Sequence, residues 1–246
     1  MDDIVSDALG FIDLNLDTLA ENLALDELLP ALADEEDAGP TLRLWEWPEY
    51  AVVLGAGCRV EDDVDVDRCE RDGIAIRRRS SGGGTVLLGP GCICSSLILP
   101  FVADPALRGV RSSYAWILQK VGAALKRLNP GIHLADVSDL AIGGRKFSGC
   151  SQQRKREHLL HHGSVLFNFD IARISRYLKL PPRRPEYRES RSHEQFLTNL
   201  GGSAEQIAGG LQAEWNATLA VLALPLERAV LLAREKYETK EWTYRR

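Results

Sequence analysis

The chain lacks the features that mark membrane proteins and disulfide-rich secreted proteins. Its apolar runs fall well short of the ~20 residues needed to cross a bilayer, and the acidic start Met1-Asp2-Asp3 lacks the basic segment of a signal peptide. Its five cysteines are odd in number, and their spacing matches neither a disulfide framework nor a zinc site. We therefore expect a cytoplasmic protein that does not span a membrane.

Aromatic residues are scarce, at 7% of the chain, and the isoelectric point lies near 5.6. Both values argue against a nucleic-acid partner, because single-strand binders combine a basic stripe with stacking aromatic side chains. The net charge is −5, but the charges are distributed unevenly along the chain. Residues 1–70 hold 20 acidic and 3 basic side chains, and residues 71–246 hold 15 acidic and 27 basic ones. The basic remainder either offsets the acidic part or lines a site for an anionic ligand or an acidic partner protein. The side chains concerned are Arg77, Arg78, Arg79, Arg145, Lys146, Arg154, Lys155 and Arg156.

The length of 246 residues and the 45% hydrophobic content are enough for one main domain with a substantial core. Apolar spacing predicts helices within 4–33 and over 110–128, 172–179, 203–222 and 226–237. Alternation and β-branched content predict strands over 42–47, 50–55, 74–80, 85–100 and 162–169. Hairpins in place of regular strand–helix–strand repeats predict an α+β fold, with a mixed, mainly antiparallel sheet packed with helices.

The segment from Asp139 to Cys150 predicts a hairpin that carries chemistry. Gly143-Gly144 is typical of a two-residue turn, which pairs Ile142 with Arg145, Ala141 with Lys146, Leu140 with Phe147, and Asp139 with Ser148. One face would then carry Asp139, Lys146, Ser148 and Cys150, with the carboxylate diagonal to the ammonium. The alternative is a solvated edge hairpin whose lysine only prevents aggregation.

A second motif, Arg77-Arg-Arg-Ser-Ser-Gly-Gly-Gly-Thr-Val86, joins two predicted strands through three glycines. Glycines let the backbone approach a ligand closely and turn its amides toward an anion, so the motif favours a phosphate or carboxylate site over a plain turn. The Walker pattern is absent, which argues against a P-loop nucleotidase.

Two adjacent histidines, His161 and His162, precede Gly163-Ser164. Neighbouring residues on a strand point to opposite faces, so both rings are not expected to bind one metal ion. Cys150 invites a nucleophile interpretation, but a single cysteine is more often a packing residue.

Several of these motifs, taken in order, resemble the lipoate-protein ligase family over nearly the whole chain. The matching segments are Glu21-Asn-Leu-Ala-Leu-Asp-Glu27, Leu42-Arg-Leu-Trp45, Val53-Leu-Gly55, Arg78-Arg-Ser-Ser-Gly-Gly-Gly-Thr-Val86, Asp139-Leu140, Gly144-Arg-Lys-Phe-Ser-Gly149, Gln152, His161-His-Gly-Ser164 and Lys236-Tyr-Glu-Thr-Lys-Glu-Trp242. The resemblance implies one biotin/lipoate ligase-like catalytic domain over 1–246, with a helical segment at about 190–246 and no separate accessory domain. It also implies an enzyme that activates lipoate with ATP and Mg²⁺ and passes the lipoyl group to a lysine of an acceptor domain.

The resemblance carries roles over to individual residues. Lys146 would hold a carboxylate or phosphate oxygen, and Asp139 would lie beside the adenylate or its Mg²⁺. The other residues of the implied substrate and adenylate site are Arg79, Ser81, Gly82, Gly83, Gly84, Thr85, Ser148, Gly149, His162, Gly163 and Ser164.

The chain departs from the family pattern in two ways. Ligases of this type usually carry an accessory domain or use a separate accessory subunit, so adenylation by this chain is expected to involve a partner polypeptide. Some related octanoyltransferases form a thioester on a cysteine before the family lysine, and His133-Leu-Ala-Asp-Val-Ser138 contains none. We therefore favour a ligase, with an ATP-independent octanoyl or lipoyl transferase and a non-catalytic lipoyl-binding protein as alternatives.

Overall fold

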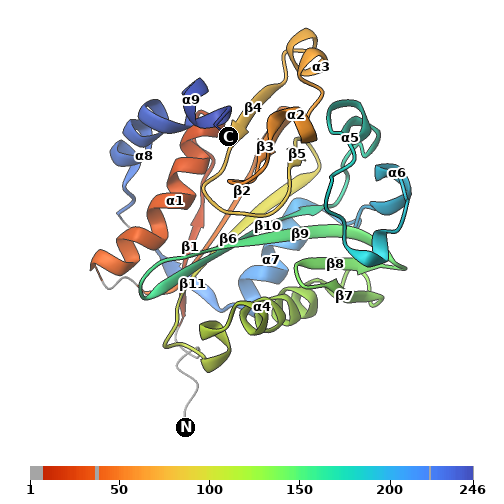
Figure 1. Ribbon diagram of the computed structural model, residues 1–246. Coiled ribbons are helices and arrows are strands. Elements are labelled where there is room, and N and C mark those ends of the chain that lie inside the picture. Colours follow the sequence, from red (N-terminus) through yellow and green to blue (C-terminus); the bar gives the residue numbers. More distant parts are fainter. Residues whose placement is uncertain (1–7, 37–38, 222, 246) are drawn as a thin grey trace.

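The computed structural model describes residues 8–36, 39–221 and 223–245, and its largest element is an eight-stranded sheet (Figure 1). The strand order is β11-β1-β2-β6-β10-β9-β8-β7. These strands are β1 (Leu9–Asp13), β2 (Thr41–Glu46), β6 (Cys92–Pro100), β7 (Ile132–Asp136), β8 (Asp139–Ile142), β9 (Arg145–Arg154), β10 (His158–Leu166) and β11 (Ala217–Ala220). β1 runs parallel to β2 and β11, and the other neighbours are antiparallel. The predicted α+β fold with a mixed, mainly antiparallel sheet is confirmed.

A second sheet of three strands, in the order β4-β3-β5, packs over one face of the large sheet. Its strands are β3 (Ala51–Leu54), β4 (Ala75–Arg78) and β5 (Val86–Leu88). The predicted strand over 85–100 is therefore broken into β5 and β6, which belong to different sheets. Gly91 lies at the break with φ of +82°, and a Cβ there would come within 2.2 Å of the Asn168 carbonyl oxygen.

Helices cover both faces of the large sheet (Figure 1). They are α1 (Leu19–Glu36), α2 (Val60–Asp63), α3 (Val66–Arg71), α4 (Val110–Leu125), α5 (Ala172–Tyr177), α6 (His193–Phe196), α7 (Ala204–Glu214), α8 (Leu226–Leu232) and α9 (Lys240–Thr243), with short 3₁₀ turns at Pro105–Arg108 and Glu186–Arg188 and a π-helical turn at Ala233–Tyr237. Within the described ranges, every helix is too short or too polar to cross a membrane.

Two cores result, one on each face of the large sheet. Alternation along β2 sends Leu42 and Leu44 into the core beneath α4 and α7, and Trp45 into the core beneath α1 and the small sheet. Arg43 lies between these leucines and is fully buried, so the face that looks toward the small sheet also carries a charge.

Two predicted helices were partly wrong because long-range pairing outweighs local spacing. Leu9–Asp13 lies within the segment 4–33 but forms β1, since β2 and β11 flank it on both sides. The helix predicted over 203–222 ends at Glu214, and β11 follows after Asn216, whose φ is +45°. Ile4 and Leu222 lie outside the described residues.

Residues near the C-terminus pack against β4, an edge strand of the small sheet. Arg78 is fully buried and donates to the carbonyl oxygens of Gly55, Cys58 and Thr243. In return, the Trp242 indole N–H donates to the Arg78 carbonyl oxygen at 2.8 Å. Arg78 therefore has a structural role, because it fixes β4, the strand that leads into the glycine-rich segment.

The buried ring of His161 predicts that stability falls in mild acid. The ring is 4% exposed, and burial, with a smaller contribution from His162, lowers the pKa of His161 to about 3. The unfolded chain takes up this proton near pH 6.5, so stability is complete above about pH 6.5 and decreases as the pH falls toward 3, by up to ~1.4 kcal/mol per pH unit. Urea unfolding between about pH 7.5 and 5 measures the slope, and His161→Asn should flatten it. An equal slope in both proteins would contradict the assignment.

Candidate active site

A cavity of about 180 Å³ lies between the two sheets, on the face of the large sheet that looks toward the glycine-rich segment. Its lining includes Leu23, Asp26, Trp45, Val53, Arg79, Gly83, Gly84, Thr85, Val86, Leu88, Cys94, Ser95, Ser96, Ser138, Lys146, Gly149, Cys150, Ser151, His162, Gly163 and Ser164. Nine of the residues expected at the site, from both motifs and from the His-Gly-Ser segment, therefore line one cavity. They are Arg79, Gly83, Gly84, Thr85, Lys146, Gly149, His162, Gly163 and Ser164.

The predicted hairpin forms, but its register holds only next to the turn. Gly143 and Gly144 have φ of +55° and +74°, and Ala141 pairs with Lys146 as expected. Phe147 is then an extra residue on β9, so Ser148 faces Leu140 and Gly149 faces Asp139. The expected pairs Leu140–Phe147 and Asp139–Ser148 were therefore wrong.

The bulge still leaves the predicted carboxylate and ammonium together. Lys146 Nζ lies 2.8 Å from Asp139 Oδ1, and the Tyr187 hydroxyl donates to Asp139 Oδ2 at 2.8 Å. Asp139 is buried, and the Lys146 side chain keeps 28% of its surface exposed. Lys146 thus presents a fixed positive charge to the cavity.

Gly149 provides the space in which the Lys146 side chain lies. A Cβ on Gly149 would come within 2.6 Å of both Cε and Nζ of Lys146. A Cβ on Gly163, across the strand pair, would lie 2.7 Å from the Gly149 carbonyl oxygen. The two glycines therefore let β9 and β10 approach closely beneath the ammonium.

The glycine-rich segment carries backbone amides without hydrogen-bond partners among the described residues. The backbone amides of Gly82, Gly83 and Gly84 have no hydrogen-bond acceptor within the described part of the chain. Gly83 has φ of +80°, and its carbonyl oxygen would lie 2.0 Å from a Cβ on Gly55, so the loop rests directly on β3. Unpaired amides in a loop of this kind attract carboxylates and phosphates.

Arg79 adds a positive charge that no carboxylate balances. Its guanidinium donates to the carbonyl oxygens of Gly82 and Gly84 and to Ser81 Oγ, and it enters no ion pair with a described residue. Burial lowers the pKa of Arg79 to about 10, so the side chain stays charged at neutral pH. A buried cation without a partner is costly, and a bound anion would remove that cost.

Part of the cavity wall is apolar, and one of its residues carries a buried donor without a partner. Trp45 is 4% exposed, and its indole N–H has no acceptor among the described residues. Leu23, Val53 and Leu88 line the same cavity. These side chains give the cavity an apolar surface, while the Trp45 N–H is buried beneath it.

Asp26, Arg43, Trp45 and Tyr187 were not predicted as site residues. Arg43 Nη1 contacts Asp26 Oδ1 at 2.6 Å, and both side chains are buried. Charged residues inside apolar stretches were the available signal, but their pairing depends on how α1 crosses β2. The expectation that the two histidines point apart is confirmed, because the His161 ring contacts Tyr114 and His162 lines the cavity.

A second cavity of about 330 Å³ meets the first at Lys146. Its lining includes Asp63, Gly84, Thr85, Asp139, Lys146, Ser148, Gly149, Ser164, Ile174, Lys179, Arg183, Arg188, His193, Phe196 and Leu197. Arg183 and Lys179 bring positive charge, and Ile174 and Phe196 bring apolar surface. Such a mixture fits a group that is part anionic and part planar or apolar.

Three thiols lie at or near the cavity, and the pKa of each is raised, which disfavours the reactive thiolate. Burial raises the pKa of Cys150, and the Asp139 carboxylate raises it further. The contact with Cys92, together with burial, raises the pKa of Cys94, and burial raises that of Cys58. Cys150 also packs against the core beneath α4, and its Sγ donates to the Ser138 carbonyl oxygen at 3.1 Å. A thioester would require a thiolate.

The residues do not fit a magnesium ion held by the protein alone. Asp139 is engaged by Lys146 at one oxygen and by Tyr187 at the other. In the described ranges, no group of three or more His, Cys, Asp or Glu side chains is placed to hold a metal. Mg²⁺ requires near-octahedral oxygen ligands, so we derive no step through a metal.

The chain is similar in sequence to a known protein family and to curated proteins. The family model described as the lipoyl protein ligase A/B catalytic domain matches residues 18–208. Among curated proteins, octanoyltransferase LipM of Carboxydothermus hydrogenoformans is 29% identical over 265 residues, which cover 96% of this chain and 98% of that protein.

Two solved structures share the fold over almost all of the chain. A bipartite lipoate protein ligase of Thermoplasma acidophilum, described together with its E2 lipoyl domain, is 23% identical with a TM-score of 0.76, and the match covers 97% of each chain. A lipoate-protein ligase A bound with ATP is also 23% identical, with a TM-score of 0.77, and the match covers 97% of this chain and 99% of that one.

Proposed function

This chain belongs to the lipoyl protein ligase A/B catalytic domain family, and on that premise we propose that it joins lipoate to a lysine of an acceptor domain through a lipoyl-adenylate made from ATP. The observation that carries the proposal is the meeting of two cavities at Lys146. One is a largely apolar cavity whose Arg79 has no ion-pair partner among the described residues, and the other is larger and carries Lys179 and Arg183.

The acyl chain would occupy the first cavity, with its carboxyl group toward Arg79 and the free amides of Gly82, Gly83 and Gly84. The nucleotide would occupy the second cavity, beside Lys179 and Arg183. Its phosphate would then lie next to Lys146, where positive charge stabilises the oxygen that becomes negative as the acyl bond forms and breaks. Holding both reactants at one junction supplies further rate through orientation.

The thiols support a ligase over a transferase that forms an acyl-cysteine. A transferase that forms an acyl-cysteine needs a reactive thiolate, whereas burial raises the pKa of Cys150 and Cys58.

A second candidate function is octanoyl or lipoyl transfer between carrier proteins without ATP. The relative named octanoyltransferase LipM favours it, because the match covers 96% of this chain. Under either function the partner is a protein with a lipoyl-type acceptor lysine, and an accessory subunit remains part of the ligase proposal.

Intact-mass spectrometry of an acceptor domain distinguishes the two functions. One reaction contains the protein, lipoate, ATP and Mg²⁺, and the other contains octanoyl-carrier protein without ATP. The ligase proposal expects modification with ATP, or from chemically prepared lipoyl-adenylate when the accessory subunit is missing. Modification only from the carrier would overturn the ligase in favour of the transferase, and transfer from chemically prepared lipoyl-adenylate would show that adenylation alone depends on an accessory subunit.

A further inference from the structure

The second cavity contains a buried carboxylate that the proposed chemistry does not use. Asp63 lies in the acidic run Glu61-Asp-Asp-Val-Asp-Val-Asp67, whose other carboxylates are exposed or partly exposed. Asp63 itself is 7% exposed and lines the second cavity. Burying a carboxylate is costly unless it gains partners, so each of its oxygens is expected to meet a donor.

The backbone around Asp63 is fixed by pairing with a distant segment. Asp63 is the last residue of α2, and its carbonyl oxygen accepts from the Lys179 backbone N–H at 2.9 Å. The next residue, Val64, forms a β-bridge with Leu178. The end of α2 is therefore joined to the segment that follows α5 (Figure 1), and the Asp63 side chain extends from a backbone that is held on both sides.

Only one oxygen of the Asp63 carboxylate has a hydrogen-bond donor within the described ranges. The Thr85 hydroxyl donates to Oδ2 at 2.5 Å. The Cys58 thiol lies near the carboxylate, but it donates to the Gly83 carbonyl oxygen at 3.3 Å. Oδ1 accepts from none of the described residues, and unlike the indole nitrogen of Trp45 it is not fully enclosed by protein atoms. Oδ1 is therefore an acceptor that a group in the cavity can reach.

Asp63 also forms no ion pair with the part of the chain that the structure describes. Lys179 lines the same cavity, but its ammonium donates to the Glu61 carbonyl oxygen at 2.7 Å. Arg78 interacts with the Asp63 charge electrostatically and without a direct contact. The missing donor for Oδ1 is therefore expected to come from a ligand.

The surroundings of Asp63 suit the flat face of a nucleobase. Val86, Ile174 and Leu178 line the second cavity, and all three pack in the core beneath the small sheet. Thr85, which donates to Asp63, lines both cavities and so connects this apolar wall with their junction. Apolar walls with a few polar groups are typical of sites that orient a planar ligand. In the proposed nucleotide the phosphate lies at the junction and the ribose follows it, so the base is the part that reaches the apolar wall.

We propose that Asp63 recognises the base of the nucleotide by accepting a hydrogen bond from its exocyclic amino group at Oδ1, an inference that rests on the proposed adenylate chemistry. The 6-amino group of adenine donates to this oxygen. The 6-oxygen of hypoxanthine, the base of inosine, would face Oδ1 with no proton between the two acceptors. Asp63 is thus a specificity-determining residue that selects an amino-bearing base, and it takes no part in the bond-making steps.

Single-turnover transfer to an acceptor domain, from chemically prepared lipoyl-adenylate and from its inosine counterpart, tests the assignment. The wild-type protein should reach half-maximal transfer at an adenylate concentration about 10- to 100-fold lower than that of the inosine compound, the range expected for one hydrogen bond to a charged group. In Asp63→Asn the Thr85 hydroxyl still donates to the side-chain oxygen, so the NH₂ group faces the cavity and the preference should reverse. Intact mass follows the product, and a thermal unfolding curve shows that the variant is folded.

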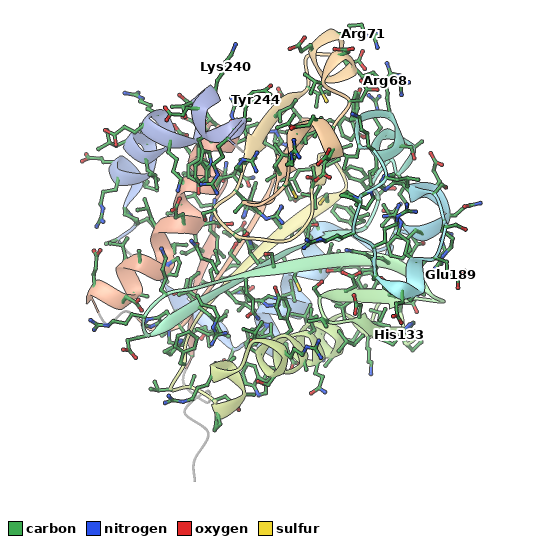
Figure 2. All side chains as sticks on the ribbon, in the orientation of Figure 1. Arg68, Arg71, His133, Glu189, Lys240 and Tyr244 are labelled. Atoms are coloured by element: carbon green, nitrogen blue, oxygen red, sulfur yellow. The ribbon has the colours of Figure 1, made fainter. Side chains whose placement is uncertain are left out.

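Asp65→Asn is the matched control, because it makes the same substitution two residues away and outside both cavities. Asp65 caps α3 and contacts Arg68 at 3.1 Å, and Arg68 lies at the outer edge of the molecule (Figure 2). Asparagine caps a helix as well as aspartate does, so this variant should keep the wild-type preference for adenylate.

The possible outcomes separate this inference from the proposed function. Equal use of the two compounds by the wild-type protein, or an unchanged preference in Asp63→Asn, would overturn the role of Asp63 and leave the ligase chemistry in place. A 2′-deoxyadenylate that loses as much as the inosine compound would also overturn it, in favour of a ribose contact. Transfer from neither compound would overturn the proposed function, and the role of Asp63 with it.

Discussion

Replacing Lys146 with alanine is expected to lower the rate of lipoyl transfer by about 10³-fold while the protein stays folded. Lys146 Nζ provides the positive charge at the junction of the two cavities, and removing one group that stabilises transition-state charge typically costs 10²–10³ in kcat. Tyr187 and Ser138 still donate to the Asp139 carboxylate in the variant, so this buried group keeps hydrogen bonds. Initial rates by intact mass and a thermal unfolding curve provide the two measurements.

A companion variant separates the position of the ammonium from its presence. In Gly149→Ala the new methyl group would occupy the space 2.6 Å from Lys146 Nζ, and the side chain can move away without a backbone shift. We expect transfer to fall substantially with little loss of stability. Wild-type rates in Lys146→Ala would refute the assignment of this site, whatever the companion shows.

Replacing Arg43 with leucine is expected to cost about 3–5 kcal/mol of folding free energy, because it leaves the buried Asp26 carboxylate without its counter-ion. Arg43 also donates to Asn22 Oδ1 at 2.6 Å and to the Asn22 carbonyl oxygen at 3.0 Å, so the connection between α1 and β2 weakens as well. Urea unfolding at neutral pH measures the loss.

The double variant Asp26→Leu/Arg43→Leu tests whether the unpaired Asp26 carboxylate causes the loss of stability in Arg43→Leu. Buried ion pairs can often be replaced by apolar residues at little cost, and the native pair leaves Arg43 Nε without a described acceptor. The double variant should therefore be more stable than Arg43→Leu alone. A single-variant loss below about 1 kcal/mol would contradict this account of the pair.

The sequence pattern predicted the turn and the loop of the site better than it predicted the strand pairing between them. Gly143-Gly144 specifies its turn within two residues, so the neighbouring pair Ala141 and Lys146 could be predicted. The bulge could not, because it depends on Phe147 entering the α4 core and on Lys146 bridging to Leu197, far along the chain. The place of the glycine-rich loop at the cavity could be predicted, because its glycines and arginine give a local signal.

The buried network had no local signal of comparable strength. Asp26 and Arg43 interrupt apolar stretches, which shows only that each needs a partner. Their contact, and the contact of Asp26 with His162, arises where α1 crosses strands that are distant in sequence. For the same reason β11 was mistaken for helix, since its identity comes from pairing with β1.

The bulge at Phe147 means that the count of residues along β9 matters as much as their chemistry. In a regular strand, residues three apart face opposite sides, yet Lys146 and Gly149 share one side because one residue has been added between them. If the same residues paired without the bulge, Gly149 would turn to the face opposite Lys146. A designer who transfers this hairpin to another sheet must therefore keep the bulge. A regular strand with the same residues would place Lys146 and Gly149 on opposite faces.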